Sequence, residues 1–346
     1  MSPAYATFGL EPATRVGAVL ADGGHQVHRD FVDFVVDGRP LLLRLSDLDA
    51  VSPLALDLPP GALDARVRDL LLESEPPLPG GRFVLYDCPE CADLGCGAVT
   101  AVIERDGEDF RWRDFAWQTG EQVDLERDGY HGTGPFRFHG PAYRAALTGL
   151  LDGVPAPAPP RRVLLVGPRA GLLVRLAAVL RGIGIGADIT LDATAVPVGE
   201  LGHYGAALIG PTVPEPERGA LREAFGRPGV GTALVTASAP ILPLLVAQLQ
   251  QALDRSPETS RRLTALTATP EAAEIEVAAP GRVQLTAYRL DRLRRVRSHT
   301  VLDATLGPGR HRLPLDSAAV RGETYLVART SQGVLTAPVR AGAARD

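Results

Sequence analysis

Short apolar runs separated by turn residues mark the first part of the chain. Two pairs of runs flank an Asp-Gly dipeptide, Arg29–Val36 with Arg39–Leu45 and Ala98–Glu104 with Phe110–Trp117. Asp-Gly between apolar runs is typical of a β-hairpin. Apolar residues at helical spacing predict helices over the segments Ala62–Glu73 and Pro141–Leu151. We therefore predict an α+β domain over residues 1–151.

The pattern changes beyond a proline-rich stretch, Asp152–Pro160, which we interpret as a semi-rigid linker. Short apolar runs now alternate with longer amphipathic ones. The expected strands are Val163–Val166, Ala187–Leu191, Ala206–Ile209 and Thr232–Val235, and the expected helices are Leu172–Arg181, Pro216–Phe225 and Ile241–Leu253. This alternation predicts a parallel sheet with right-handed crossovers, and hence a Rossmann-like α/β domain over residues 161–256.

Evenly spaced short strands dominate the last third of the chain, with Gly or Pro between them. They are expected at Ala273–Val277, Val283–Leu290, Thr300–Leu306, His311–Leu315, Thr324–Arg329 and Val334–Val339. Such spacing is typical of a small β-sandwich, which we place at residues 268–340. The predicted fold class is therefore multi-domain α/β and α+β.

Composition narrows the possible functions. The chain of 346 residues has a net charge of -5 and no apolar run near the roughly 20 residues that cross a bilayer. We accordingly expect a cytoplasmic protein that binds neither nucleic acid nor membranes. The chain contains no lysine, so all 36 of its basic residues are arginine. This excludes Schiff-base enzymes, phosphate-loop NTPases and dehydrogenases that need a Tyr/Lys pair.

A glycine-containing turn follows the first strand of the middle domain. It reads Gly167-Pro-Arg169-Ala-Gly171, and Asp192 follows the second strand. Rossmann folds hold a pyrophosphate at the first position and a ribose at the second, so these four residues form a candidate site for NAD. Arg169 occupies the place of the second glycine of G-x-G-x-x-G. The alternative is a scaffold without cofactor, in which the glycines only allow a tight turn and close helix packing.

Two residues before the third strand are considered as further members of this candidate NAD site. His203 and Tyr204 carry groups that can transfer protons, but we interpret both as residues of a solvated loop.

All three cysteines lie within nine residues, in the segment Cys88-Pro-Glu-Cys91-Ala-Asp-Leu-Gly-Cys96. The C-P-x-C turn presents two thiolates to one zinc ion, and Cys96 adds a third. A closed zinc site needs a fourth ligand, for which the candidates are His28, Asp93, His131 and His139. Two alternatives remain: three buried cysteines that pack as small apolar groups, and a pair that oxidises reversibly.

The first 145 residues or so resemble a family of uncharacterised proteins from high-GC bacteria. The resemblance rests on Cys88-Pro-Glu-Cys91-Ala-Asp93-Leu-Gly-Cys96-Gly97, Ala98-Val-Thr, Trp112-Arg-Asp-Phe115 and Gly134-Pro-Phe-Arg-Phe138. Ala92 stands where this turn usually has glycine. Some members with an appended Rossmann-like segment are loosely labelled oxidoreductases, and the resemblance supports the domain boundaries more than it supports a function.

Two classes of function follow from these features. The first is an oxidoreductase-like protein that binds a dinucleotide in the middle domain and acts on an unknown small molecule. The second is a non-catalytic scaffold that binds protein partners and contains a degenerate Rossmann-like domain. The glycine turn with Asp192 favours the first class, and the absence of a legible catalytic group favours the second.

Overall fold

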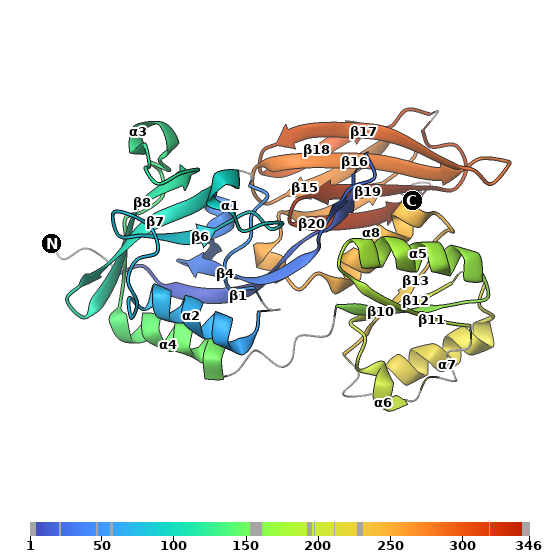
Figure 1. Cartoon of the computed structure of the whole chain (residues 1–346). Helices are drawn as coiled ribbons and strands as arrows, with labels where there is room; N and C mark the ends of the chain where they lie inside the picture. Colours follow the sequence, from blue (N-terminus) through green and yellow to red (C-terminus); the bar gives the residue numbers. More distant parts are fainter. Residues whose placement is uncertain are drawn as a thin grey trace. The chain divides into compact units, whose positions relative to one another are not determined.

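The computed structural model describes residues 5–20, 22–45, 48–55, 58–152, 161–191, 196, 198–210, 212–226, 231–317 and 319–340. The protein is of mixed α/β type and forms two compact units (Figure 1). Unit 1 comprises Met1–Arg15, Arg29–Ala158 and Arg255–Ser260. Unit 2 comprises Val16–His28, Pro159–Asp254 and Arg261–Asp346, so the parallel sheet and the C-terminal strands share one unit. Residues 153–160 of the predicted linker lie outside the described residues.

A three-stranded antiparallel sheet opens unit 1. Its middle strand, β4 (Arg29–Val36), pairs with β1 (Phe8–Arg15) on one side and β5 (Arg39–Pro40) on the other. The predicted hairpin is therefore wrong beyond Pro40, because Leu41–Arg44 forms the short helix α1 instead of a strand. In the helix, Leu41 and Leu42 point into the core. The main partner β1 escaped prediction, since Gly9 and Pro12 weaken its strand pattern.

The second sheet of unit 1 has the order β6-β7-β8-β9. Its strands are Arg82–Tyr86, Ala98–Asp106, Asp109–Gln118 and Phe136–Phe138. The pairing of β7 with β8 around Asp106-Gly107 confirms the second predicted hairpin. Helices α2 (Pro60–Leu70) and α4 (Gly140–Asp152) form where they were expected, and α3 (Leu125–Asp128) is a further single turn.

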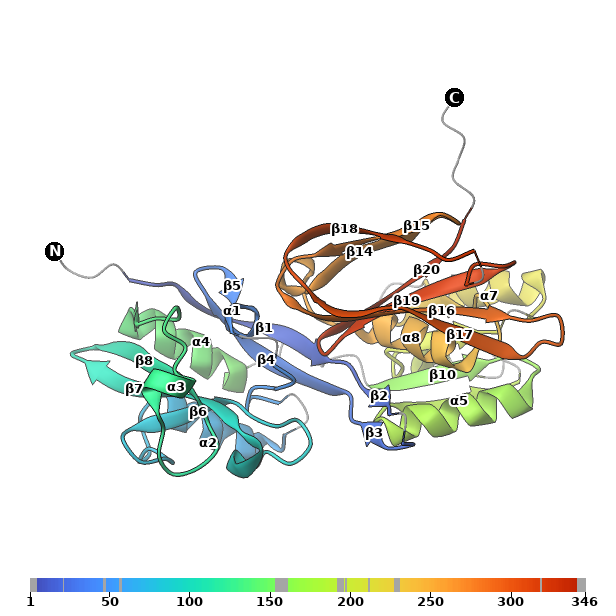
Figure 2. The ribbon, with the colours of Figure 1, turned by 90° about the horizontal axis from the view of Figure 1, so that it is seen from above.

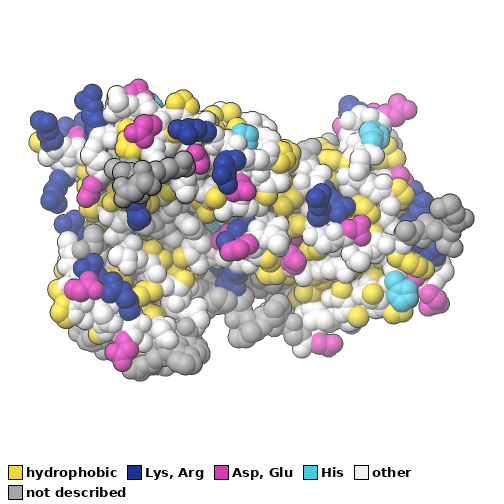
Figure 3. Space-filling view, turned by 180° about the vertical axis from the view of Figure 1, so that it is seen from behind, with side chains coloured by type: hydrophobic (Ala, Val, Ile, Leu, Met, Phe, Trp, Pro, Cys, Tyr) yellow, Lys and Arg dark blue, Asp and Glu magenta, His cyan; other side chains and the backbone are white. Residues whose placement is uncertain are grey.

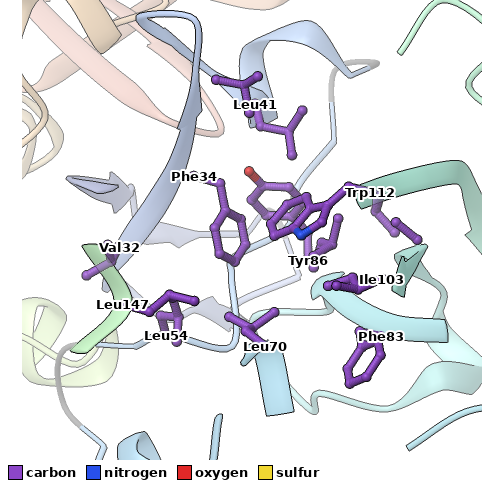
Figure 4. Close-up of a cluster of buried hydrophobic side chains, with 14 of the residues drawn as sticks. Val32, Phe34, Leu41, Leu54, Leu70, Phe83, Tyr86, Ile103, Trp112 and Leu147 are labelled. Atoms are coloured by element: carbon purple, nitrogen blue, oxygen red, sulfur yellow. The ribbon is translucent and has the colours of Figure 1, made fainter. Parts of the chain in front are cut away.

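An aromatic core joins these elements. Phe34, Tyr86 and Trp112 are buried in it together with aliphatic side chains of the helices (Figure 4). The Trp112 indole N–H donates to the Tyr143 hydroxyl at 3.2 Å, and that hydroxyl donates to the Leu70 carbonyl at 3.0 Å. The buried indole N–H of Trp112 and the buried hydroxyl of Tyr143 thus both have partners, as buried polar groups require.

A four-stranded parallel sheet forms the first half of unit 2, with the order β11-β10-β12-β13. Its strands are β10 (Arg162–Val166), β11 (Gly186–Thr190), β12 (Ala206–Ile209) and β13 (Ala233–Thr236). The helices are α5 (Ala170–Gly182), α6 (Val198–Leu201), α7 (Glu215–Phe225) and α8 (Leu242–Leu253). Alternate residues of β10 enter two separate cores, one with α5 and α8 and the other with α7, so helices cover both faces. The predicted parallel sheet is confirmed.

Two antiparallel sheets complete unit 2 and share one core. The orders are β14-β15-β18 and β17-β16-β19-β20. In chain order the strands are Leu263–Ala268, Ala272–Val277, Gly281–Leu290, Val296–Leu306, Gly309–Pro314, Thr324–Thr330 and Gly333–Pro338. The four-stranded sheet also packs its other face on α8, through residues such as Val327 and Leu244. Helix α8 therefore covers part of that face.

A hairpin from the N-terminal region belongs to unit 2. It pairs β2 (Ala18–Val19) with β3 (His25–Gln26) and lies beside α5 (Figure 2). At the end of α5, a Cβ on Gly182 would lie 2.6 Å from the His25 ring, so a larger residue there would require the exposed His25 side chain to move. The His28 N–H donates to the Ile183 carbonyl at 2.8 Å and fixes the hairpin to the loop after α5.

Charges of both signs are mixed on the molecular surface. On the face shown in Figure 3, arginine side chains lie among aspartate and glutamate side chains. Arg282 with Asp303 and Arg113 with Glu104 are two of the ion pairs. Within the described residues, no helix has both the length and the apolar character needed to cross a membrane.

Candidate metal centre

The three cysteines lie in the connection between β6 and β7, residues 87–97, which we call the knuckle. Two backbone hydrogen bonds between Asp87 and Val51, of 2.9 and 3.1 Å, anchor its first end. The Ala92 N–H then donates to the Cys88 carbonyl at 2.9 Å and closes a turn. A single 3-10 turn over Leu94–Cys96 leads into β7. The antiparallel strands thus bring both ends of the knuckle together and fold its thiols onto one another.

The three thiols form one cluster. The Sγ atoms of Cys88, Cys91 and Cys96 all lie within 4.8 Å of one another, and Cys91 Sγ lies 3.3 Å from Cys96 Sγ. Zn–S bonds of about 2.3 Å in a tetrahedron separate two sulfurs by about 3.8 Å, which falls inside this range. The cluster could hold a metal ion. Cys91 and Cys96 are exposed, so the alternative of three buried, inert cysteines is wrong.

Backbone N–H groups point at two of the sulfurs. Cys88 accepts from the N–H groups of Glu90 and Cys91, and Cys91 accepts from that of Asp93. Burial disfavours the Cys88 thiolate, but these donors and the neighbouring thiols outweigh it, so the pKa of Cys88 is lowered. The Asp93 N–H favours a Cys91 thiolate, but the thiols of Cys96 and Cys88 raise the pKa of Cys91 to about 11. Of these two thiols, Cys88 is therefore the more acidic.

A buried arginine, Arg15, supports the knuckle through Glu90. Arg15 at the end of β1 is only 1% exposed and forms a two-pronged pair with Asp49, at 2.8 and 2.7 Å. Its remaining nitrogen donates to Glu90 Oε1 at 2.8 Å. Burial opposes the charge of Arg15, but Asp49 and Glu90 outweigh burial and raise its pKa. On the paired strand, Arg29 Nε donates to the Pro89 carbonyl at 3.1 Å.

Sequence reasoning missed both arginines. Arg15 and Arg29 face each other across β1 and β4, far from the cysteines along the chain. No local motif marks them, because their role comes from the pairing of those two strands.

Two backbone conformations shape the knuckle. Ala92 has a φ of +51°, the left-handed conformation that favours glycine. Gly97 has a φ of +99°, and a Cβ there would lie 2.0 Å from the Trp117 ring. Gly97 therefore lets the indole of β8 cover the end of the knuckle.

None of the expected fourth ligands joins the cluster. Within the described residues, the group that could hold a metal contains the three cysteines alone. Asp93 Oδ1 accepts a hydrogen bond from the Gly95 N–H at 2.7 Å, so its side chain caps the start of the 3-10 turn. His131 lies 3.4 Å from the Glu126 carbonyl, and His139 packs against the Tyr5 ring. His28 belongs to unit 2.

The predicted nucleotide site lies at the carboxyl edge of the parallel sheet. Gly167 follows β10 with a φ of +154°, and a Cβ on it would lie 3.6 Å from the Cα of Gly210, which follows β12. Arg169 is exposed and caps α5 without a side-chain hydrogen bond. A Cβ on Gly171 would meet open space, so close helix packing does not require this glycine. Asp192 lies outside the described residues.

Tyr204 does not lie in a solvated loop, and that expectation is wrong. It is buried, bonds Asp188 through its hydroxyl, and lies under the guanidinium of Arg162 at 5.6 Å. Because it precedes β12, it lies at the amino edge of the parallel sheet, opposite Gly167 and Gly210. His203 is exposed, as expected.

Comparison with known proteins gives no further assignment. No family model matches the chain, and no curated protein or solved structure matches it significantly.

Proposed function

We propose that this protein is a zinc-binding protein whose ion is held by Cys88, Cys91 and Cys96. The convergence of three Sγ atoms within 4.8 Å carries the proposal. Thiolates are soft ligands that select zinc among the common divalent ions of tetrahedral sites. The N–H donors to Cys88 and Cys91 stabilise the negative charge that such an ion requires.

The fourth coordination position is proposed to face solvent. The thiols of Cys91 and Cys96 are exposed, and Asp93 Oδ1 accepts a hydrogen bond from the Gly95 N–H. Zinc sites with three protein ligands keep a fourth position for water or another molecule. The buried Arg15 and its contact with Glu90 make the site rigid, which favours selective binding over a mobile loop.

Zinc content tests this proposal. Protein purified with a reductant should contain about one zinc per chain, and Cys88→Ser or Cys91→Ser should lose nearly all of it. Asp93→Asn keeps an oxygen for the Gly95 N–H and should retain the metal, which makes it the matched control. A folded wild-type chain that takes up no zinc and forms a Cys91–Cys96 disulfide in mild oxidant would instead support the redox interpretation.

A second candidate function is dinucleotide binding at the parallel sheet. The supporting observation is the meeting of Gly167 and Gly210 at the ends of β10 and β12, next to the first turn of α5. These two strands are neighbours although the chain forms β11 between them, so this is the point where the strand order reverses. Nucleotides bind at such points in α/β sheets, where the backbone can approach a phosphate closely.

A thermal-shift titration with NAD, NADH and NADP tests this second function. A ligand that binds only the folded state stabilises it by about 2.7 kcal/mol at a hundredfold excess over its dissociation constant. Gly171→Trp should abolish the shift, whereas Gly149→Trp, at an equally open position on α4, should leave it unchanged. If none of the three dinucleotides shifts the transition, the partner-binding scaffold becomes the better proposal for unit 2.

A further inference from the structure

A second hollow of unit 2 has the make-up of a ligand site. It has a volume of about 750 Å³, within the usual range for small-molecule pockets. All of its lining residues belong to unit 2 and come from the β2–β3 hairpin, α5, α8, β16 and β19. The hollow therefore shares no residue with the knuckle of unit 1 and involves neither Gly167 nor Gly210.

Strand alternation places a polar row on one wall. Along β16, Val283, Leu285 and Ala287 enter the shared core of the two antiparallel sheets. The residues that alternate with them point to the opposite face, so Gln284, Thr286 and Tyr288 line the hollow. On the neighbouring strand β19, Val327 and Arg329 line it in the same way, and Arg329 pairs directly with Gln284.

The guanidinium of Arg329 is the central charged group of this wall. Its Nη1 donates to Gln250 Oε1 at 2.9 Å, and Gln250, which is fully buried, donates its own amide to the Gly17 carbonyl. Gln250 thus fixes the guanidinium and links it to the hairpin. Among the described residues, Arg329 has no carboxylate partner, in contrast to Arg282 beside it, which pairs with Asp303 at 2.7 Å.

The electrostatic balance of the wall favours an anion. Burial lowers the pKa of Arg329, but a guanidinium in a protein stays protonated. No aspartate or glutamate lines the hollow. Thr286 and Tyr288 add two hydroxyl groups to the wall. A partly buried guanidinium without a counterion costs free energy, and a bound anion would offset that cost.

The rest of the hollow is apolar. Val179 of α5, Leu242 and Val246 of α8, and Val327 form its aliphatic side. At the rim, Val19 and Leu20 of the hairpin remain 49% and 42% exposed. Large apolar side chains exposed beside a concave surface are typical of a binding site.

We propose that this hollow binds a small organic acid with an apolar body, whose carboxylate pairs with Arg329 and whose body lies against α5, α8 and the hairpin. The ligand thereby supplies the counterion that the described residues do not provide. Gln250 acts as a positioning residue, because it holds the guanidinium in place and ties it to the hairpin at the rim.

Calorimetric titration of the full chain with decanoate and with decanol tests the proposal. The two probes share an apolar tail, so their difference in affinity reports the contribution of the carboxylate. We expect decanoate to bind about 10- to 100-fold more tightly than decanol, as charged hydrogen bonds allow. Arg329→Gln should reduce decanoate binding to the level of decanol and leave decanol binding nearly unchanged.

A second variant covers the case in which Arg329→Gln fails to fold. Gln284 is exposed and lies opposite Arg329, so Gln284→Glu adds a carboxylate of the same shape beside the guanidinium. This variant should weaken decanoate by about tenfold. Arg312→Gln, on the exposed face of β18, is the matched control and should bind like the wild type. Equal affinities for the two probes, no binding of either, or unchanged decanoate affinity in Gln284→Glu would overturn the proposal.

Discussion

The knuckle and the hollow around Arg329 are built in opposite ways. The three thiols come from nine consecutive residues, and the turns of that short segment bring them together. The hollow takes its walls from six elements that are spread along the chain from β2 to β19. In the knuckle the ligands are local and only the supports, Arg15 and Arg29, are distant. In the hollow even the central charge and its positioning residue come from different elements.

The difference implies that the two sites respond to different changes. Backbone strain within the knuckle should disturb its thiols directly, whereas the hollow depends on how strands and helices of unit 2 pack. Three changes in unit 1 test this contrast and should leave decanoate binding in unit 2 unaltered.

The largest effect is expected from Gly97→Ala. The new Cβ would lie 2.0 Å from the Trp117 ring at a φ of +99°, so the indole or the knuckle must move. Overpacking and left-handed strain together should cost about 2–5 kcal/mol and weaken zinc binding. Urea unfolding followed by tryptophan fluorescence measures the loss, since both tryptophans, Trp112 and Trp117, lie in unit 1.

Gly107→Ala is the matched control for this variant. Gly107 also has a positive φ, +65°, but a Cβ there meets nothing within 4 Å. We expect only the conformational cost of about 1–2 kcal/mol and unchanged zinc content. Equal losses in the two variants would contradict the argument that the Trp117 contact positions the knuckle.

A pH effect of intermediate size is expected from Asp33 on β4. Burial raises the pKa of Asp33 to about 7 from its ordinary 3.8, although hydrogen bonds from Tyr86, Phe34 and Leu42 favour the carboxylate. The folded state therefore binds this proton more tightly than the unfolded state. The stabilisation is complete below about pH 4 and is lost as the pH rises to about 7. At about 1.4 kcal/mol per pKa unit, the loss amounts to at most roughly 4 kcal/mol.

Asp33→Asn separates this effect from the other titrating groups. The amide has no charge to desolvate, so the difference in unfolding free energy between variant and wild type should shift towards the variant from pH 4 to pH 8. Urea midpoints by tryptophan fluorescence at intervals of one pH unit give the curve. A constant difference across this range would contradict a raised pKa for Asp33.

The smallest effect is expected from Ala92→Gly. The left-handed conformation costs alanine about 1–2 kcal/mol, a cost that glycine avoids. Glycine loses more conformational entropy on folding, which offsets about 0.5–1 kcal/mol of this gain. The variant should therefore be more stable by about 0.5–1 kcal/mol and keep its zinc. Ala62→Gly in the exposed first turns of α2 is the control and should be less stable by about 1 kcal/mol. Destabilisation of both variants alike would contradict the conformation of Ala92.

The local pattern determined much of the fold. The alternation of short apolar runs with amphipathic segments placed each strand of the parallel sheet and helices α5, α7 and α8 within two residues. The Asp-Gly turn placed the β7–β8 hairpin, and the C-P-x-C spacing placed the thiols. These features depend on neighbours along the chain, so their physical causes are present in the sequence itself.

Weakly patterned elements were not predictable in this way. β1 contains Gly9 and Pro12, β14 changes register between Leu263 and Ala265, and Leu41 begins a helix where an apolar strand was expected. Their conformations follow from the partners available, since a strand edge or a core cavity outweighs a weak local preference.

The supports and charges of both sites were decided by the tertiary structure alone. Arg15 reaches Glu90 only because β1 pairs with β4, and Arg329 meets Gln250 only because α8 packs on β19 and β20. Tertiary packing likewise decided that Tyr204 is buried beside Asp188 and Arg162. A side chain's partner, its burial and thus its charge state depend on residues distant in the chain, and no local spacing encodes them.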